Sequence, residues 1–537
     1  MEALTKTEPA QAPDERQHAV LARVDANVLR VALVVYCAFV FFWNLGAAPL
    51  VDVDEGAFSE ATREMLARRD FITTYLNDAL RFDKPILTYW LQAIPVSLVG
   101  PVEWAFRLPS ALAACLWTWL LYRFARREVP EASLMAPFML ASAIGPLLIA
   151  RAATADALLN AFIAGSLFAF YAFLAHGRRI DLIAGFAWTG LGVLTKGPVG
   201  AVVPALTVIL FCATRGDWKR PLLLLRDPVA WLVFLLIALP WYLLELHAQG
   251  WPFVEGFFLK HNVNRYTSTM LGHGGHVWYY IVALPLIAFP FVAPLIGTVL
   301  GARAGWQRDL ERFAWCAFAT VFVFFSVSRT QLPHYLLYGM SPLFLLLALH
   351  RGRIAHPAAQ IAPALLGLAL VALIPAIAAR VSDSTGNAFT KMLLAELPEA
   401  MKPVAFAAIV AAVIVLILAI IVHRARITDR IDAALYVAGA IPAIFIVAVF
   451  WPAAIRWNQA PIVAAAQASR AAGTPVVEWN TNWPSFSVYR EAPTPVRKPE
   501  PGEVVLTRAD RLDALPPHEV VFRQREVVLA RIVGAAR

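Results

Sequence analysis

The sequence predicts an all-α polytopic membrane protein with about thirteen transmembrane helices, interfacial helices in its first outer loop, and a small C-terminal α/β domain. Of the 537 residues, 59% are hydrophobic and only 15% are charged. A soluble chain has roughly 45–50% apolar and about 25% charged residues. Apolar runs of roughly 18–22 residues recur along the chain, and each is long enough to cross a bilayer.

The predicted spans form a transmembrane domain over residues 29–451. They lie near 29–49, 104–124, 132–150, 154–175, 180–196, 197–213, 228–247, 277–300, 312–328, 334–350, 359–379, 402–422 and 433–451. Residues 1–28 are polar and lack the apolar core of a signal peptide, so we expect a cytoplasmic tail followed by an uncleaved anchor. All four cysteines lie in apolar runs without CxxC or CxxH spacing, which predicts neither a disulfide framework nor a cysteine metal site.

The positions of arginine and lysine predict the orientation, because cytoplasmic loops collect these residues. Every loop on one side carries at least two of them, as at Arg126–Arg127, Arg178–Arg179 and Arg351–Arg353. We therefore expect the N-terminus inside and, after an odd number of spans, the C-terminus outside. In a bacterium this places the protein in the inner membrane with its outer face in the periplasm.

The residue pattern changes after the last predicted span, where the chain is no longer apolar throughout. Residues 452–537 alternate short strand-like runs (VVEW, EVVL, VVFRQREVVLARI) with a helix-like one, PIVAAAQASRAAG. This pattern predicts a periplasmic α/β accessory domain of roughly 80 residues that does not carry the chemistry.

Two outer segments, 50–103 and 248–276, are too long to be simple connectors and could build a site at the membrane surface. The first begins with VDVDEGAFSEATREML, which opens with three closely spaced carboxylates, Asp52, Asp54 and Glu55. Residues 55–69 read as an amphipathic interfacial helix. Its expected apolar face holds Phe58, Ala61 and Met65, and its polar face Glu60, Arg63, Glu64 and Arg68. Helix capping by Asp52 or Asp54 is the structural alternative, but it explains only one carboxylate.

A series of outer-face motifs resembles the bacterial aminoarabinose-transferase-like glycosyltransferases, relatives of the dolichyl-phosphate-mannose protein mannosyltransferases. The motifs follow the family order over about residues 30–350: VDVDEGAFSEATREML, FDKPILTYW, WAFRLPSAL, DALL, LTKGPVG, FFLKHNVNRY with a following GHGG, and FSVSRTQLPHYLL. Two departures concern the sugar. Ala57-Phe58 stands where the family often has Arg-Tyr, and Asp83 stands where the aminoarabinose branch usually has Glu.

The resemblance implies a C-type glycosyltransferase fold and a polyprenyl-phosphate sugar donor, with undecaprenyl phosphate as the expected carrier. Lipid A, another surface glycan and protein hydroxyls remain open as acceptors; membrane lipids are expected partners, and nucleic acid is not. The candidate residues group by role: Asp54 and then Glu55 as base or sugar-orienting carboxylate; Lys84, Lys196, Arg265 and Arg329 on the donor phosphate; Asp83, Tyr89, His334 and Tyr335 on substrate. No cofactor is expected with certainty. Asp83 and His261 are candidate ligands of a divalent ion, although their spacing matches no tight metal motif. The favoured alternative is that His261 is an interfacial histidine whose hydrogen bonds are satisfied by neighbouring groups.

A polyprenyl-linked sugar or lipid transporter is the alternative from another class. Ionisable groups would mark its path through the membrane, and its fold would repeat broken helices in inverted order. The sequence shows almost no charged residue in mid-span and no clear inverted repeat. A structural scaffold, the third reading, leaves the polar cluster on the outer face unexplained.

Overall fold

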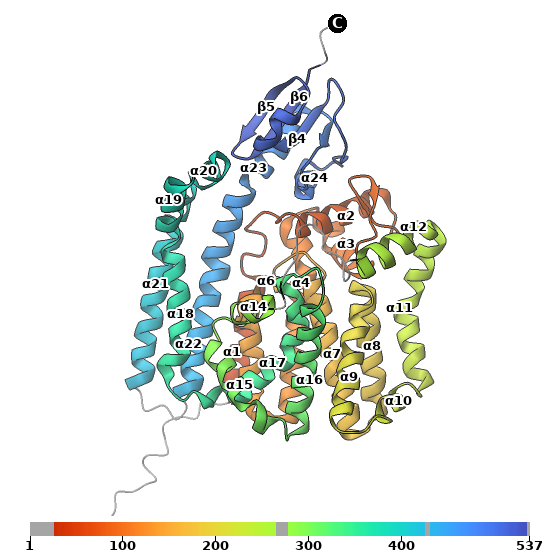
Figure 1. The fold of residues 1–537 in the computed structure, drawn as a ribbon, viewed down its shortest axis with the longest axis vertical. Coiled ribbons are helices and arrows are strands. Elements are labelled where there is room, and N and C mark those ends of the chain that lie inside the picture. The colour runs from red at the N-terminus through yellow and green to blue at the C-terminus, as the bar shows by residue number, and fades with distance from the viewer. Residues whose placement is uncertain (1–25, 265–275, 277, 425–429, 534–537) are drawn as a thin grey trace, which may run out of the picture.

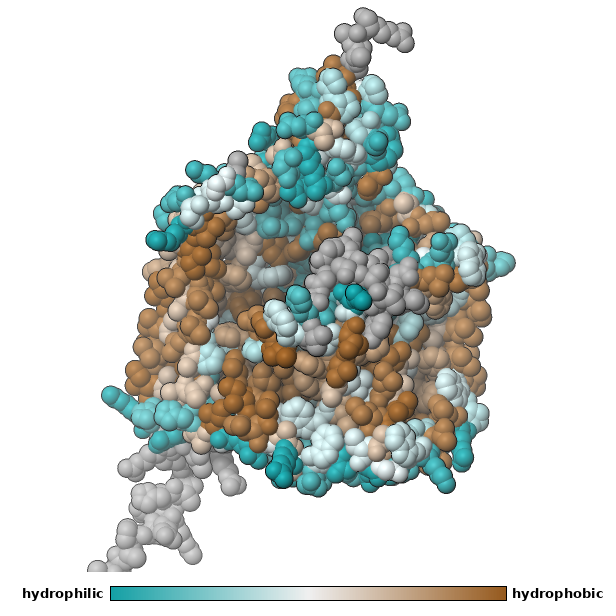
Figure 2. Space-filling view, viewed as in Figure 1, coloured by the Kyte–Doolittle hydropathy of each residue, from teal (hydrophilic) through white to brown (hydrophobic). Residues whose placement is uncertain are grey.

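Long apolar helices lie side by side and carry the C-terminal sheet at one end (Figure 1). The structure, a computed structural model, describes residues 26–264, 276, 278–424 and 430–533. Figure 2 shows a brown apolar belt around the helices, with polar residues gathered at both ends of the molecule. This distribution is that of a protein whose belt lies in lipid.

The helices of the belt follow the predicted segments. They are α1 (Ala26–Phe42), α4 (Glu103–Glu128), α5 (Met135–Ser142), α6 (Ile144–Ala150), α7 (Asp156–His176), α8 (Arg179–Lys196), α9 (Val199–Thr214), α11 (Pro228–Gln249), α14 (Tyr279–Ile287), α15 (Val292–Gly305), α16 (Asp309–Ser326), α17 (Met340–His350), α18 (Pro357–Ala372), α19 (Ile374–Ser384), α21 (Leu397–Arg424), α22 (Arg430–Phe445) and α23 (Trp451–Ala472). Short helical turns join them: η2 (Pro130–Ala132), α10 (Arg220–Leu224), η4 (Pro333–Gly339), η5 (Arg351–Arg353) and η6 (Ile446–Phe450).

The predicted count of about thirteen spans is not confirmed. Among the described residues, four helices are long and apolar enough to cross a membrane, or up to six if each of two bent pairs forms one span. The pairs are η2–α5 with α6, bent by 67°, and α18 with α19, bent by 47°. Pro146 and Pro375 lie at the starts of α6 and α19, where a missing N–H and a fixed φ interrupt a helix. Apolar composition therefore continues through breaks that shorten the individual helices.

The first outer loop contains α2 (Asp54–Arg68), a hairpin of β1 (Tyr75–Leu76) and β2 (Ala79–Leu80), and α3 (Leu87–Val99). The apolar face of α2 packs as predicted, with Phe58, Ala61 and Met65 buried. Of the predicted polar face, Arg68 is exposed and Arg63 is half-buried, but the two glutamates are not open to the interface. Glu60 and Glu64 are 0% and 2% exposed. The C-terminal domain packs against α2, and Glu64 accepts hydrogen bonds from the amides of Asn77 and Asp78 in the hairpin.

The C-terminal domain is a four-stranded sheet with the order β3-β4-β6-β5, which confirms a small α/β unit in this region. Its elements are β3 (Val476–Glu478), α24 (Pro484–Arg490), β4 (Val504–Arg508), η7 (Ala509–Ala514), β5 (His518–Gln524) and β6 (Val527–Ile532). Strands β3 and β4 are parallel, and the other pairs are antiparallel. Helical structure is continuous over 430–472, so the predicted domain boundary at 452 lies inside a helix that also packs against this sheet.

Candidate active site

Glu55, in the first turn of α2, forms a buried ion pair with Arg107 of α4. Two of its carboxylate–guanidinium contacts measure 2.7 and 2.8 Å, and both side chains are at most 5% exposed. Glu55 also accepts hydrogen bonds from the amides of Val51 and Ala153, at 2.9 and 2.7 Å. The predicted motifs around residues 51–66, 104–112 and 151–159 therefore meet at one carboxylate. Because its oxygens are fully engaged, we expect Glu55 to fix the loop rather than to react.

Asp54 differs from its neighbour because its side chain is exposed at the beginning of α2. The N-cap residue is Val53, and no side-chain cap is found at this helix start in the described part of the chain. Asp52 is engaged elsewhere, since its carboxylate accepts hydrogen bonds from the amide and hydroxyl of Ser485. Side-chain capping therefore does not account for the charge of this stretch. Of the three carboxylates at the start of the loop, Asp54 is therefore the accessible one.

A polar group follows the β1–β2 hairpin. Arg81 lies 3.3 Å from Asp83 and donates to the Tyr89 hydroxyl at 3.3 Å. Lys84 donates to the Asp83 carbonyl at 3.0 Å. Burial lowers the pKa of Arg81, but the nearby Tyr89, Asp83 and Asp54 outweigh this and raise it. Asp54 is thus within electrostatic reach of this group. Tyr89 is itself fully buried, so we expect it to position Arg81 rather than to touch substrate.

A second polar group joins three predicted motifs around Asp156, the first residue of α7. Its carboxylate lies 2.5 Å from the Lys196 ammonium and accepts from the Tyr338 hydroxyl at 3.0 Å. Lys196 also lies 2.8 Å from that hydroxyl and 5.6 Å from the centre of the Tyr335 ring. His334 Nε2 is 3.9 Å from Asp156. Lys196, His334 and Tyr335 were selected from the sequence, whereas Asp156 was missed. Its signal was a carboxylate opening an apolar run, which is also typical of a plain helix start.

One apolar cluster lies between the two polar groups. It includes Phe58 and Tyr89 from the first outer loop, Ala155 beside Asp156, and Leu194 just before Lys196. Phe257 of η3 (Val254–Asn264), which follows α12 (Trp251–Phe253), completes it. The two long outer segments, which could together build a site, are therefore packed against each other beside the start of α7 and the end of α8.

Arg329 is exposed between α16 and η4. Arg265 and the side chain of His261 lie outside the described residues. Within the described ranges no group of three histidine, cysteine, aspartate or glutamate side chains could hold a metal ion, and Asp83 contacts Arg81 instead.

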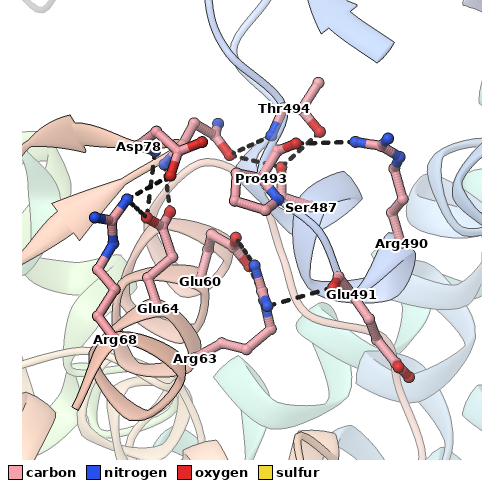
Figure 3. A network of polar contacts seen from close by, with 11 residues as sticks. Glu60, Arg63, Glu64, Arg68, Asp78, Ser487, Arg490, Glu491, Pro493 and Thr494 are labelled. Carbon is pink, nitrogen blue, oxygen red and sulfur yellow. Dashed lines mark hydrogen bonds and ion pairs between the residues drawn. The ribbon is translucent and has the colours of Figure 1, made fainter. Parts of the chain in front are cut away.

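A network of polar side chains connects the first outer loop with the C-terminal domain (Figure 3). The side-chain oxygen Oδ1 of Asn77 accepts hydrogen bonds from the Ser487 hydroxyl at 2.7 Å and the Thr494 amide at 3.1 Å. Arg63 pairs with Glu60 at 2.6 Å and donates to the Glu491 carbonyl at 3.3 Å. These contacts, with the Asp52–Ser485 hydrogen bonds, make the domain part of the loop's support.

We expect this docking to weaken as the pH rises. Burial raises the pKa of Asp52 from 3.8 to about 7, so the folded protein holds its proton more tightly than the unfolded chain. The stabilisation is complete below about pH 4 and is lost as the pH rises to about 7, at no more than about 1.4 kcal/mol per pH unit. The melting temperature of purified protein between pH 4.5 and 8 measures this loss. Burial also raises the pKa of Glu60 to about 7, so the melting temperature of the Asp52→Asn variant should still fall with pH, but less steeply. An equally steep fall in the variant and the wild type would contradict the assignment to Asp52.

Comparisons with known proteins agree with this fold. A family model described as dolichyl-phosphate-mannose-protein mannosyltransferase matches residues 83–243. The undecaprenyl phosphate-alpha-4-amino-4-deoxy-L-arabinose arabinosyl transferase of Serratia proteamaculans is 29% identical over 332 residues, covering 59% of this chain and 58% of that protein. An uncharacterized protein of Aquifex aeolicus is 30% identical over 329 residues, covering 60% of this chain and 73% of that protein. The chain thus spans less than two thirds of the length of its Serratia relative.

The fold is shared with a solved structure over nearly its whole length. The crystal structure of ArnT from Cupriavidus metallidurans bound to undecaprenyl phosphate superposes with a TM-score of 0.76 at 22% identity, covering 94% of this chain and 98% of that one. The architecture therefore defines the class of helical membrane proteins with an ArnT-like fold and a small C-terminal sheet. Within that class, the chain belongs to the family of aminoarabinose-transferase-like and protein-mannosyltransferase-like glycosyltransferases, and the predicted family is confirmed.

Proposed function

We propose that this chain is an integral-membrane glycosyltransferase that moves a sugar from a polyprenyl-phosphate donor, with undecaprenyl phosphate as carrier, to an envelope acceptor. The observation that carries the proposal is the placement of exposed Asp54 and two cation-bearing polar groups around one apolar cluster. The buried cluster packs the segments that carry the two polar groups against each other, and their cations suit the phosphate of the donor. The names of the Serratia and Cupriavidus relatives support the same donor.

The reaction would be a displacement at the anomeric carbon. The acceptor oxygen forms the new bond to this carbon while the bond to the phosphate oxygen breaks, and the polyprenyl phosphate leaves with the electron pair. Lys84, with Lys196, Arg265 and Arg329, would neutralise the leaving phosphate. Asp54 would take the proton of a hydroxyl acceptor, which implies inversion. With a phosphate acceptor no base is required, and Asp54 would orient the sugar.

We place the reaction on the periplasmic face of a bacterial inner membrane, with a cytoplasmic N-terminus. The arginine-rich loops on the opposite side support this orientation. Lipid A, another surface glycan and protein hydroxyls are the acceptor classes under this proposal.

Donor consumption by purified full-length protein in detergent tests the function. A glycosyltransferase should release polyprenyl phosphate when donor and envelope lipid are supplied together. A transporter would leave the donor chemically intact and would need a sealed compartment to show activity. An intact donor in the presence of lipid A, envelope glycan and envelope protein would contradict the proposal and favour the transporter.

Lys84→Ala should lower donor affinity and turnover together, because a phosphate contact already made in the ground state contributes to both. A hydrogen bond to a charged group is worth roughly 1.5–3 kcal/mol, which corresponds to about a ten- to hundredfold effect. Binding of labelled donor and the rate of transfer measure the two losses. Lys402→Ala, at an exposed lysine of α21, is the matched control. Unchanged donor affinity in folded Lys84→Ala protein would remove Lys84 from the phosphate site.

A further inference from the structure

A groove of about 410 Å³ lies between α1 and α4, within the apolar belt. The two helices pack against each other, and the groove is lined by Leu33 and Ala38 of α1 and by Cys115 of α4. Val34 and Trp119 also line it and are exposed, so the groove opens on the surface that faces lipid. Its volume falls within the range of roughly 300–1,000 Å³ found for small-molecule sites.

Most of the groove offers no polar partner to a ligand. The lining residues of α1 that follow Arg30 are all apolar. Thr118 of α4 also lines the groove, but its hydroxyl donates to the Ala114 carbonyl of its own helix at 2.8 Å. In a bilayer, where van der Waals packing rather than the hydrophobic effect holds apolar groups together, such a lining suits a lipid acyl chain.

Three arginines gather at one end of the groove. Arg30 lines it near the beginning of α1. The Arg123 guanidinium lies 5.3 Å from the centre of the Trp119 ring, and Arg126 donates to the Tyr122 hydroxyl at 3.3 Å. Because Trp119 and Tyr122 are lining residues, they hold both cations beside the groove.

The arginines share one end because α1 and α4 run in opposite directions. Arg107, near the start of α4, donates to the carbonyls of Leu45 and Ala48, just after the end of α1. The beginning of α1 therefore lies beside the end of α4. This is the end at which the arginine-rich loops predict the cytoplasmic membrane surface.

The charge at this end of the groove favours an anion. No carboxylate occurs among the described residues that line the groove. Glu128, at the end of α4, is engaged by Arg127 at 3.1 Å and by His176 at 2.9 Å. Basic pockets between helices at the cytoplasmic surface are recurrent sites for anionic lipid headgroups, and guanidinium groups suit a phosphate.

We propose that the groove binds one anionic phospholipid from the leaflet on the arginine-rich side. An acyl chain lies between α1 and α4, and the phosphate contacts Arg30, Arg123 and Arg126. Phosphatidylglycerol carries a net negative charge, whereas the amine of phosphatidylethanolamine balances its phosphate, so the site prefers the former. The candidate active site lies at the other ends of these helices, where Glu55 meets Arg107. The inference therefore does not rest on the proposed function.

Native mass spectrometry of delipidated full-length protein tests the site by measuring the affinity of the first bound lipid. Long-chain phosphatidylglycerol should bind at least about fivefold more tightly than phosphatidylethanolamine with the same chains. Short-chain phosphatidylglycerol, which keeps the headgroup but cannot fill the groove, should bind several-fold more weakly than the long-chain lipid.

Variants of the two parts of the site separate headgroup from chain. Arg30→Gln/Arg126→Gln should weaken phosphatidylglycerol binding roughly twentyfold, whereas Arg424→Gln, at an exposed arginine that ends α21, should bind like the wild type. Ala38→Phe places a ring in the groove and should weaken long-chain lipid binding several-fold. Val31→Phe, at an exposed position of the same helix outside the groove, is its matched control.

Equal binding of the two long-chain lipids, or wild-type affinity in folded Arg30→Gln/Arg126→Gln protein, would overturn the inference. Wild-type affinity in Ala38→Phe, or short-chain lipid binding as tightly as the long-chain lipid, would show that no acyl chain occupies the groove and would overturn it as well. Arg123→Gln, at an exposed arginine, replaces the double variant if that protein does not fold.

Discussion

Asp54→Asn should reduce sugar transfer to a hydroxyl acceptor by roughly 10²–10⁴-fold, equivalent to about 3–5 kcal/mol of activation barrier. The carboxylate is exposed at the beginning of α2, beside a buried ion pair that fixes the helix start. Asparagine keeps the size of the side chain but cannot accept a proton. Steady-state transfer and donor affinity, measured on the same preparation, separate a loss of turnover from a loss of binding.

Stability distinguishes this role from a structural one. Removing a charge from the first turn of a helix costs only about 0.3–1 kcal/mol at an exposed site, so the melting temperature should change little. Asp78→Asn, at an exposed carboxylate of the same loop, is the matched control and should transfer normally. Wild-type turnover by folded Asp54→Asn protein would show that Asp54 is not the base. The loss of turnover in Asp54→Asn would also be small if the acceptor were a phosphate, because no base is then required. Repeating the assay with a hydroxyl acceptor identifies that case.

The apolar segments could be predicted because burial in lipid demands long apolar runs whatever their partners are. The breaks could not, since Pro146 and Pro375 lie within runs that remain apolar on both sides. Composition measures how apolar a segment is, whereas the bend angle depends on how neighbouring helices pack against it. The predicted positions of the helices were therefore more accurate than the predicted number of spans.

The candidate site shows the same limit at the level of single residues. Charged residues on the expected outer face could be selected from their unusual positions, and the structure joins Lys196 to His334 through Asp156. Which carboxylate is accessible could not be predicted, because Asp54 and Glu55 are adjacent in the sequence. Their difference arises from Arg107, whose guanidinium pairs with the Glu55 carboxylate. The burial of Glu60 depends in the same way on a domain that follows hundreds of residues later.

Arg107→Met should be the most destabilising single change considered, because it leaves the buried Glu55 carboxylate without its cation. Breaking a buried ion pair on one side typically costs about 3–5 kcal/mol. Arg107 also donates to the carbonyls of Leu45, Ala48 and Pro49, so the end of α1 should loosen with the loop. Thermal unfolding in detergent and protease sensitivity of the first outer loop measure the effect.

The double variant Glu55→Gln/Arg107→Met decides between a positioning and a chemical role for Glu55. With the charge removed on both sides, the double variant should be more stable than Arg107→Met, giving an interaction energy of roughly 1–3 kcal/mol in the double-mutant cycle. The amides of Val51 and Ala153 donate to different carboxylate oxygens of Glu55. Glutamine can still accept one of these two hydrogen bonds, which preserves part of the loop geometry. Transfer per folded molecule should then fall less than in Asp54→Asn. A stable Glu55→Gln protein with turnover as low as that of Asp54→Asn would show instead that Glu55 takes part in the reaction.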